Sequence, residues 1–261
     1  MPKFAANLTM MFNEWEFLDR FAAAADAGFN AVEFLFPYAH SPGDISDRLQ
    51  ANGLTQALFN LPPGDWAVGE RGLAALPGRG AEFRDSVATA LRYAEATGVK
   101  RLHVMSGNAD RRNPAHRQAF EEALMHACDA AAATGLDIVI EPINGRDMPD
   151  YFLNDFGFAV ETIRRLNRAN LKLQYDIYHR QILHGDVLKS LEALTPLIGH
   201  VQVASVPGRN EPGSGELNDF RVFQALDALG YAGFVGCEYR PAGKTLDGLS
   251  WWAAWRPATK E

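Results

Sequence analysis

The chain has 261 residues, of which 47% are hydrophobic and 22% are charged, and its formal net charge is -7 at pH 7. This composition is typical of a folded globular protein and excludes a disordered or fibrous chain. The acidic balance argues against nucleic acid as a partner, because binding to phosphate backbones relies on clustered Lys and Arg.

Cysteine usage and the N-terminal residues bear on where the protein works. Cys128 and Cys237 form no CxxC pair, and the first residues lack a basic start followed by a long apolar stretch. Both features favour a reducing cytoplasm. No apolar run approaches about 18 uncharged residues, so we expect no membrane span and no membrane partner. A small molecule is the expected binding partner.

Short apolar runs alternate with longer amphipathic segments along the whole chain, the pattern of repeated βα units around a parallel sheet. Apolar residues recur every three or four positions in the predicted helices, which include Glu14 to Ala27, Arg84 to Thr97, Pro114 to Thr134, Gly157 to Leu166 and Phe220 to Leu229. Eight strands are predicted, at Lys3 to Leu8, Ala31 to Leu35, Thr55 to Asn60, Arg101 to Ser106, Asp137 to Glu141, Leu171 to Asp176, His200 to Ala204 and Phe234 to Glu238.

These units predict an α/β fold in which residues 1–261 form a single (β/α)8 TIM-barrel domain. An open doubly wound sheet is the competing architecture. It would normally carry a glycine-rich turn after the first strand, and NLTMMFNEWEF contains no glycine. Long loops rich in Pro, Gly and charged residues follow the strands at 62–80, 144–155 and 207–216. In a barrel, the face that carries these loops holds the active site.

Four polar residues close the last four predicted strands: Glu141, Asp176, Gln202 and Glu238. Side chains alternate along a strand, and the apolar neighbours of each residue point to the helices, so all four are expected to face the barrel axis at one end. Alone, each residue could cap a loop or pair with Lys or Arg. Together, three carboxylates in a small volume would repel one another unless a cation lies between them. The all-oxygen ligand set suits Mg²⁺, or Mn²⁺, better than Zn²⁺.

Several motifs extend this reading: IVIEPIN, YDIYHRQ, HVQVASVPGRNEPGSGELN, GCEYRP, FNLPPGDW and AANLTMMFNE. On these motifs the chain resembles hydroxypyruvate isomerase, nearly from end to end, and more broadly the xylose isomerase-like barrel superfamily. The resemblance implies that Glu141 and Glu238 are an acid/base pair that also binds the metal. It implies that Asp176 and Gln202 complete the metal coordination.

The expected reaction is an aldose-ketose isomerisation of a small hydroxy-keto acid. The substrate would chelate the metal through its carbonyl and hydroxyl oxygens, which acidifies the C–H between them and stabilises an enediolate. One glutamate would take the proton and the other would return it to the neighbouring carbon. For hydroxypyruvate the product would be tartronate semialdehyde.

Other residues are expected to bind the substrate. Arg209 is the leading candidate for its carboxylate, because a guanidinium can form two hydrogen bonds with it. His179 is placed in the first turn of a helix, where it either binds a substrate oxygen or caps the helix. Strand ends and loops on the same face supply the remaining candidates, each of which could instead satisfy loop backbone: Asn60, His103, Glu216 and Asn7.

Alternative functions remain open at this point. Isomerisation of 2-oxo-tetronate or a related acid or sugar would use the same metal and glutamates. A ketohexose 3-epimerase and an endonuclease IV-like phosphodiesterase are disfavoured, because both families have a metal-binding histidine at the position that Gln202 occupies in this chain. Outside enzymes, the chain could be a sugar-binding protein on a degenerate barrel. The C-terminal LSWWAAW would pack either under the barrel or against a second subunit, so a homo-oligomer is an open expectation.

Overall fold

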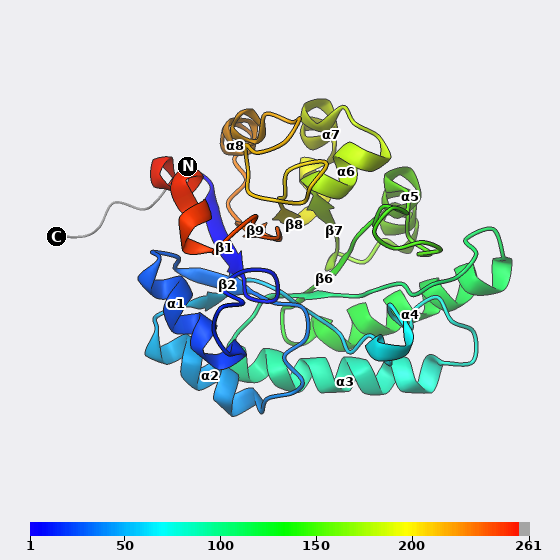
Figure 1. The fold of residues 1–261 in the computed structure, drawn as a ribbon. Helices are drawn as coiled ribbons and strands as arrows, with labels where there is room; N and C mark the ends of the chain where they lie inside the picture. The colour runs from blue at the N-terminus through cyan, green and yellow to red at the C-terminus, as the bar shows by residue number, and fades with distance from the viewer. Residues whose placement is uncertain (256–261) are drawn as a thin grey trace.

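Parallel strands alternate with helices in the computed structural model, which describes residues 1–255 (Figure 1). The strands are β1 Lys3–Asn7, β2 Ala31–Glu33, β3 Thr55–Gln56, β4 Phe59–Asn60, β5 Arg101–His103, β6 Asp137–Ile140, β7 Leu171–Asp176, β8 Ile198–Gln202 and β9 Phe234–Cys237. The α-helices are α1 Arg20–Asp26, α2 Pro42–Ala51, α3 Gly80–Thr97, α4 Pro114–Ala132, α5 Phe156–Leu166, α6 Ile177–Leu183, α7 Val187–Leu194 and α8 Asp219–Ala228. Short 3-10 segments lie at η1 Phe17–Asp19, η2 Trp66–Val68, η3 Thr195–Leu197 and η4 Leu246–Ala254.

The strands close into a barrel. Their hydrogen-bonded order is β3-β2-β1-β9-β8-β7-β6-β5-β4, so the two ends of the sheet are β3 and β4. Only Ala57 and Leu58 separate these two strands in the chain. The Ala57 amide donates to the Val32 carbonyl at 2.8 Å, and the Leu61 amide donates to the His103 carbonyl at 2.9 Å. Because this segment bonds to both neighbours, β3 and β4 are two parts of the third of eight barrel strands, which confirms the predicted fold class.

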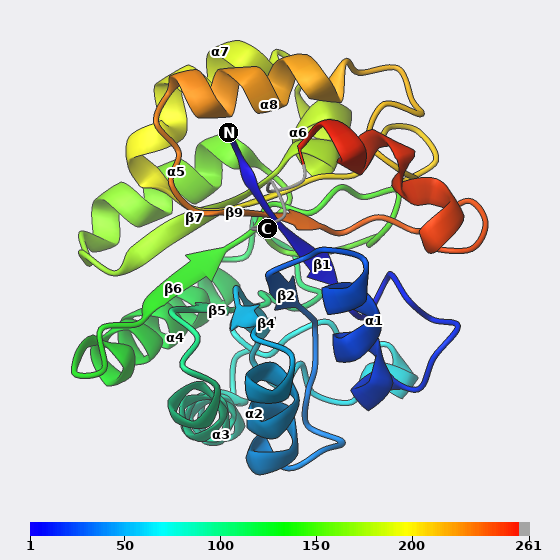
Figure 2. The same cartoon turned by 90° about the vertical axis from the view of Figure 1, so that its left-hand side faces the viewer.

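The helices surround this barrel. The strands meet in the middle of Figure 2, and α1 to α8 lie around them. The expected helices are present, although α1 is shorter than predicted because η1 replaces its first turns. Their ends follow local signals: Ser41 and Asp44 form a capping box at the start of α2, and Gly98, with φ of 70°, ends α3. No helix of residues 1–255 has the length and apolar character needed to cross a bilayer.

The interior of the barrel changes in character from one end to the other. Near the start of the strands, Ala5, Ala31 and Ala57 form a small apolar cluster with Phe234 against it. Toward the strand ends the inward side chains become polar and buried, among them Glu33, Gln174 and His200. The small residues allow close packing at the start of the strands, and the polar side chains line the interior toward the strand ends.

The C-terminal aromatic segment forms the eighth helical element of the ring around the barrel. η4 follows β9 and lies between α8 and α1 (Figure 2). Trp252 is buried and stacks on Phe29 with ring centroids 4.7 Å apart, and Trp251 packs edge-on against Phe4 at 5.3 Å. The aromatic cluster was expected under the barrel or against a second subunit, and it packs instead within its own chain, between α8 and α1 at the side of the barrel.

Replacing Trp252 with alanine should destabilise the protein by about 3–5 kcal/mol, because a large buried aromatic leaves a cavity and loses its stacking partner. Trp15→Ala is the matched control: Trp15 is 38% exposed, so its loss should cost much less. Urea denaturation followed by circular dichroism measures both midpoints. Equal midpoints for the two variants would show that η4 is not an integral layer of the barrel.

Candidate active site

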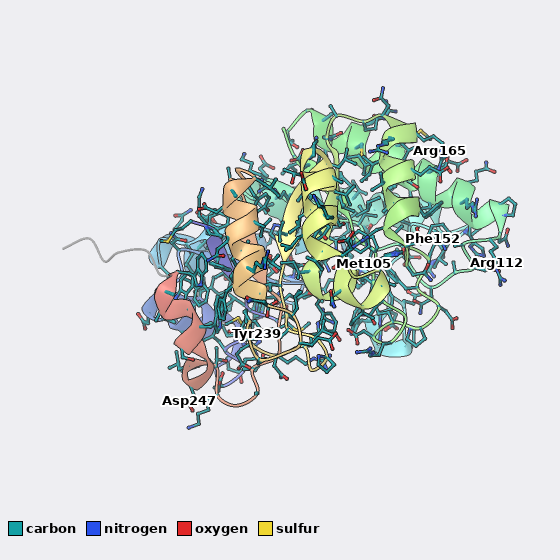
Figure 3. All side chains as sticks on the ribbon, turned by 90° about the horizontal axis from the view of Figure 1, so that it is seen from above. Met105, Arg112, Phe152, Arg165, Tyr239 and Asp247 are labelled. Carbon is teal, nitrogen blue, oxygen red and sulfur yellow. The ribbon has the colours of Figure 1, made fainter. Side chains whose placement is uncertain are left out.

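A cavity of about 220 Å³ opens where the strands end. Met105, one of its lining residues, lies toward the middle of the molecule in Figure 3, whereas Arg112 lies at the outer edge. The lining side chains come from several strand ends and the loops that follow them, and they include Asn60, Trp66, Arg71, His103, Met105, Glu141, Asp147, His179, Arg209, Glu238 and Arg240. The cavity is therefore on the face predicted from the long loops.

Three carboxylates and an imidazole converge at this cavity, which Glu141, His179 and Glu238 line and behind which Asp176 is fully buried. Glu141, Asp176, His179 and Glu238 each offer one atom, and these atoms all lie within 4.8 Å of one another. Glu141 and Glu238 come directly after β6 and β9, and Asp176 is the last residue of β7. Asp176 also caps α6, since its Oδ1 accepts hydrogen bonds from the Tyr178 and His179 amides at 2.6 and 3.2 Å. The cap occupies one oxygen and leaves Oδ2 for the cavity.

Burial makes this cluster unfavourable without a cation. It raises the pKa of Asp176 to about 6 and the pKa of Glu238 to about 8, and it raises the pKa of Glu141, which the neighbouring Glu238 and Asp176 raise further. Glu141 Oε1 and Asp176 Oδ2 are buried without a hydrogen-bond partner. Buried oxygens left unpaired in this way fit a hard divalent cation, which prefers oxygen ligands. The residues of the cluster are thus of a kind that can hold such an ion.

The orientation of His179 follows from its other ring nitrogen. The Asn144 backbone amide donates to His179 Nδ1 at 3.3 Å, and the Asn144 side-chain nitrogen lies 2.6 Å from the same atom. The Asn144 side-chain oxygen accepts from the amides of Arg146 and Asp147, which fixes the side-chain nitrogen toward the ring. Nδ1 is therefore an acceptor, so the neutral ring carries its proton on Nε2.

That proton faces the carboxylates. His179 Nε2 lies 3.9 Å from Glu141 Oε1 and 3.8 Å from Asp176 Oδ2. Burial lowers the pKa of His179 well below its usual value, so the ring is neutral near pH 7. A protonated Nε2 has no lone pair for a metal ion. His179 is consequently placed to donate a hydrogen bond to whatever lies between the carboxylates.

Gln202 lies at the floor of the cluster, and its amide is held from both sides. Its Nε2 donates to Glu33 Oε1 at 2.8 Å, which turns its Oε1 toward Gln174 Nε2 at 2.6 Å. Gln174 Nε2 also donates to Glu141 Oε2 at 3.0 Å. One amide nitrogen thus holds the oxygens of Gln202 and Glu141 beside each other.

Glu33 organises this floor. Its carboxylate is fully buried, accepts from Asn7 Nδ2 at 2.9 Å and lies 2.6 Å from His200 Nε2, in addition to its bond with Gln202. A Cβ atom at Gly236 would collide with this carboxylate. The glycine in β9 is therefore required so that Glu33 can reach Gln202.

Arg209 lines the cavity from the loop after β8. Its Nη2 donates to Glu238 Oε2 at 2.6 Å and its Nη1 to Asp147 Oδ2 at 3.1 Å, while the guanidinium lies 5.1 Å from the ring centroid of Tyr178. Burial opposes its charge, but the surrounding carboxylates raise the pKa of Arg209 above its usual value. Both terminal nitrogens are thus engaged by carboxylates of the chain itself.

The remaining predicted residues divide into two groups. Asn60 and His103 line the cavity, with His103 Nδ1 3.2 Å from Asn60 Oδ1 and His103 Nε2 3.8 Å from Glu141 Oε2. Asn7 and Glu216, which were also expected to line the pocket, are not among the residues that line this cavity. Asn7 is used by Glu33 and by the turn amides of Thr9 and Met10, and Glu216 is exposed.

Some residues around the site were missed in the sequence. Glu33 ends β2, but the predicted strand continued to Leu35, so Glu33 was not recognised as a strand-end residue. Gln174 precedes Asp176 by two positions and shares its inward face. Asn144, Asp147 and Arg71 lie in loops, where no periodicity shows which side chains turn inward.

Comparisons with known proteins identify the family of the chain. The family model described as "Xylose isomerase-like TIM barrel" matches residues 21–255. The chain therefore belongs to the xylose isomerase-like TIM barrel family. Within it, the chain belongs with the hydroxypyruvate and 2-oxo-tetronate isomerases, because relatives with those names match at 42–56% identity over nearly their full length.

Three of these comparisons cover almost the whole chain. The 2-oxo-tetronate isomerase of Cupriavidus necator is 56% identical over 96% of this chain and 97% of its own. The hydroxypyruvate isomerase of Escherichia coli is 42% identical over 98% of this chain and 100% of its own. A solved structure titled "AP endonuclease, family 2" from Brucella melitensis superposes with a TM-score of 0.96 at 50% identity, over 98% of this chain and 100% of its own.

The tautomer of His179 can be tested without any substrate. In the metal-free protein, ¹⁵N NMR of the histidine rings should show His179 with Nε2 protonated and Nδ1 unprotonated, with His179→Gln used to assign the signal. Asn144→Ala should give a mixture of tautomers, because one of the two donors to Nδ1 is lost. A protonated Nδ1 in the unsubstituted protein would contradict the hydrogen-bond pattern described above.

Proposed function

We propose that the protein is a metal-dependent isomerase that interconverts small hydroxy-keto acids, moving a proton between adjacent carbons through an enediolate. The observation that carries this proposal is the buried cluster at the barrel mouth, where one atom each of two glutamates, an aspartate and a histidine lie within 4.8 Å of one another. The names of the relatives at 42–56% identity support the same class of reaction.

Two substrates are favoured within this class. The 56% identical relative is a 2-oxo-tetronate isomerase, so we place 2-oxo-tetronate first, ahead of the hydroxypyruvate expected from the motifs. Hydroxypyruvate stays as the second candidate because the E. coli relative of that name is 42% identical. In both acids a hydroxyl-bearing carbon adjoins the ketone, so the same proton transfer applies.

The metal ligands proposed are Glu141, Asp176, Gln202 and Glu238. The cation is Mg²⁺, or Mn²⁺, since all four residues offer oxygen. When bound, a divalent cation would polarise the substrate's carbonyl and neutralise developing negative charge. The unpaired oxygens of Glu141 and Asp176 support these assignments.

The chain's own residues carry out the proton transfer. Glu141 and Glu238 approach the cluster from β6 and β9, so the ionised glutamate can take the C–H proton while the other, in its protonated form, gives a proton to the neighbouring carbon. The substrate's hydroxyl proton passes to the former carbonyl oxygen, which completes the exchange. Arg209 holds Glu238 in place through its 2.6 Å ion pair. His179, with its proton on Nε2, would donate to the substrate oxygen that gains negative charge. Asn60 and His103 line the same cavity and would contact the rest of the substrate.

Glu141→Gln and Glu238→Gln should each lower kcat for 2-oxo-tetronate and hydroxypyruvate by about 10²–10⁴-fold, because an amide cannot accept the proton. Circular dichroism should show an intact fold. Glu216→Gln serves as the control, because Glu216 is exposed and outside the cavity. Turnover within a few-fold of the unsubstituted enzyme in either site variant would refute the proton-transfer roles.

Metal binding should be visible in a thermal-shift titration. At about 100 times its dissociation constant, Mg²⁺ or Mn²⁺ should stabilise the folded state by about 2.7 kcal/mol, which corresponds to a rise in Tm of roughly 5–10 °C. Glu141→Gln and Glu238→Gln should lose most of the rise, and Glu216→Gln should keep it. A sugar-binding protein on a degenerate barrel would show no metal-dependent rise and no effect of either substitution.

A further inference from the structure

The charges around the cavity leave open which group would bind the carboxylate of an acidic substrate. Glu141, Asp176, Glu238 and Asp147 bring four carboxylates to the site, and Arg209 is the cation paired with two of them. A divalent ion would offset part of the remaining charge. A substrate that carries a carboxylate of its own still requires a cation that the chain's acids do not occupy.

Arg71 is such a cation. It lines the cavity, and among residues 1–255 no carboxylate forms an ion pair with it. The adjacent acid, Glu70, is directed elsewhere, with its carboxylate 2.7 Å from Arg79. Nη1 of Arg71 donates to the backbone carbonyls of Trp66 and Glu70 at 3.1 and 2.7 Å. Its Nε and Nη2 have no hydrogen-bond partner in the described chain.

The guanidinium of Arg71 is also held in position. Its Cζ lies 3.9 Å from the ring centroid of Trp66, and Trp66 packs in turn against Phe36 at 5.1 Å. Stacking and the two carbonyl bonds fix the plane of the guanidinium while one edge stays free. A cation ordered in advance loses less entropy when it binds an anion. Arg240, the third arginine of the cavity, is exposed and has no such support.

The two held arginines approach from opposite sides. Arg71 belongs to the loop after β4, in the third barrel strand, and Arg209 belongs to the loop after β8, in the seventh. In an eight-stranded barrel these strands face each other across the axis. A short acid lying across the cavity can therefore have its reacting carbons near Glu238 and Arg209 and its carboxylate on the side of Arg71.

We propose that Arg71, stacked on Trp66, binds the substrate's carboxylate and makes the site selective for acids. This assigns to Arg71 the role that the sequence suggested for Arg209, and it leaves Arg209 to position Glu238. The inference rests on the proposed isomerase function, and it names the residue that restricts the substrate class.

The test compares an acid with its neutral counterpart. Hydroxypyruvate carries a carboxylate where dihydroxyacetone carries a hydroxymethyl group. When either compound is incubated with the Mg²⁺-loaded enzyme in D2O, its uptake of deuterium reports deprotonation. Arg71→Gln should raise KM for hydroxypyruvate about 10- to 100-fold with kcat within a few-fold, the loss expected for a charge-assisted pair of hydrogen bonds. KM for dihydroxyacetone should change by less than about twofold.

Further variants locate the effect. Arg71→Lys should retain part of the affinity for acids, because lysine keeps the positive charge but lacks the paired N–H donors of a guanidinium. Arg112→Gln makes the same change in net charge at an exposed position far from the cavity (Figure 3) and should leave both KM values unchanged. An acid-selective rise in KM with Arg209→Gln or Arg240→Gln, but not with Arg71→Gln, would overturn the proposal, as would equal losses on both compounds.

A binding measurement separates this inference from the proposed reaction. Glycerate lacks the ketone and cannot isomerise, and calorimetry should show that Arg71→Gln binds it about 10- to 100-fold more weakly than the unsubstituted protein. If the unsubstituted enzyme exchanged deuterium into neither compound, the isomerase function would fail while glycerate still decided the role of Arg71. Equal affinity of the two proteins for glycerate, or no binding to either, would refute the carboxylate site.

Discussion

The crowding of buried carboxylates at the barrel mouth is the constraint to which the other features of the site respond. Glu141, Asp176 and Glu238 converge where burial removes most of their contact with water, and their repulsion opposes the folded state unless each has a partner. Arg209 supplies one partner, the start of α6 supplies another, and Gln174 supplies a third. The carboxylate oxygens without a partner mark the position at which a cation would stabilise the cluster.

Below that cluster, one further buried carboxylate has its hydrogen-bond partners within the protein. Glu33 is surrounded by Asn7, His200 and Gln202, all within hydrogen-bond distance. The Glu33 carboxylate has its hydrogen-bond partners within the protein, whereas Glu141 and Asp176 each keep one carboxylate oxygen without a partner among residues 1–255. Glu33 therefore has a structural role, whereas Glu141, Asp176 and Glu238 have oxygens available to bind a ligand.

The barrel and the strand-end residues could be predicted because both follow from period-two alternation in short apolar runs. That rule brought Glu141 and Glu238 to the cavity and Asp176 into the same cluster, but it did not find Glu33, because the predicted second strand continued to Leu35 whereas β2 ends at Glu33. The third strand was predicted as one piece, whereas its ladder is interrupted at Ala57 and Leu58. The partners of Arg209 and the placement of Arg71, Asn144 and Asp147 depend on loop conformation, which local sequence patterns do not specify. Glu216 also lies in a loop, and its side chain is exposed.

Gly236 has an implication for how this barrel can vary. The space its missing side chain leaves is filled by the carboxylate of Glu33, from a strand more than 200 positions earlier in the chain. Any larger residue at 236 would force the acid away from Gln202, so the two positions are sterically linked. Protein engineers who reshape the floor of this pocket should therefore alter them as a pair, and natural descendants that lose the glycine should also carry a shorter side chain at position 33.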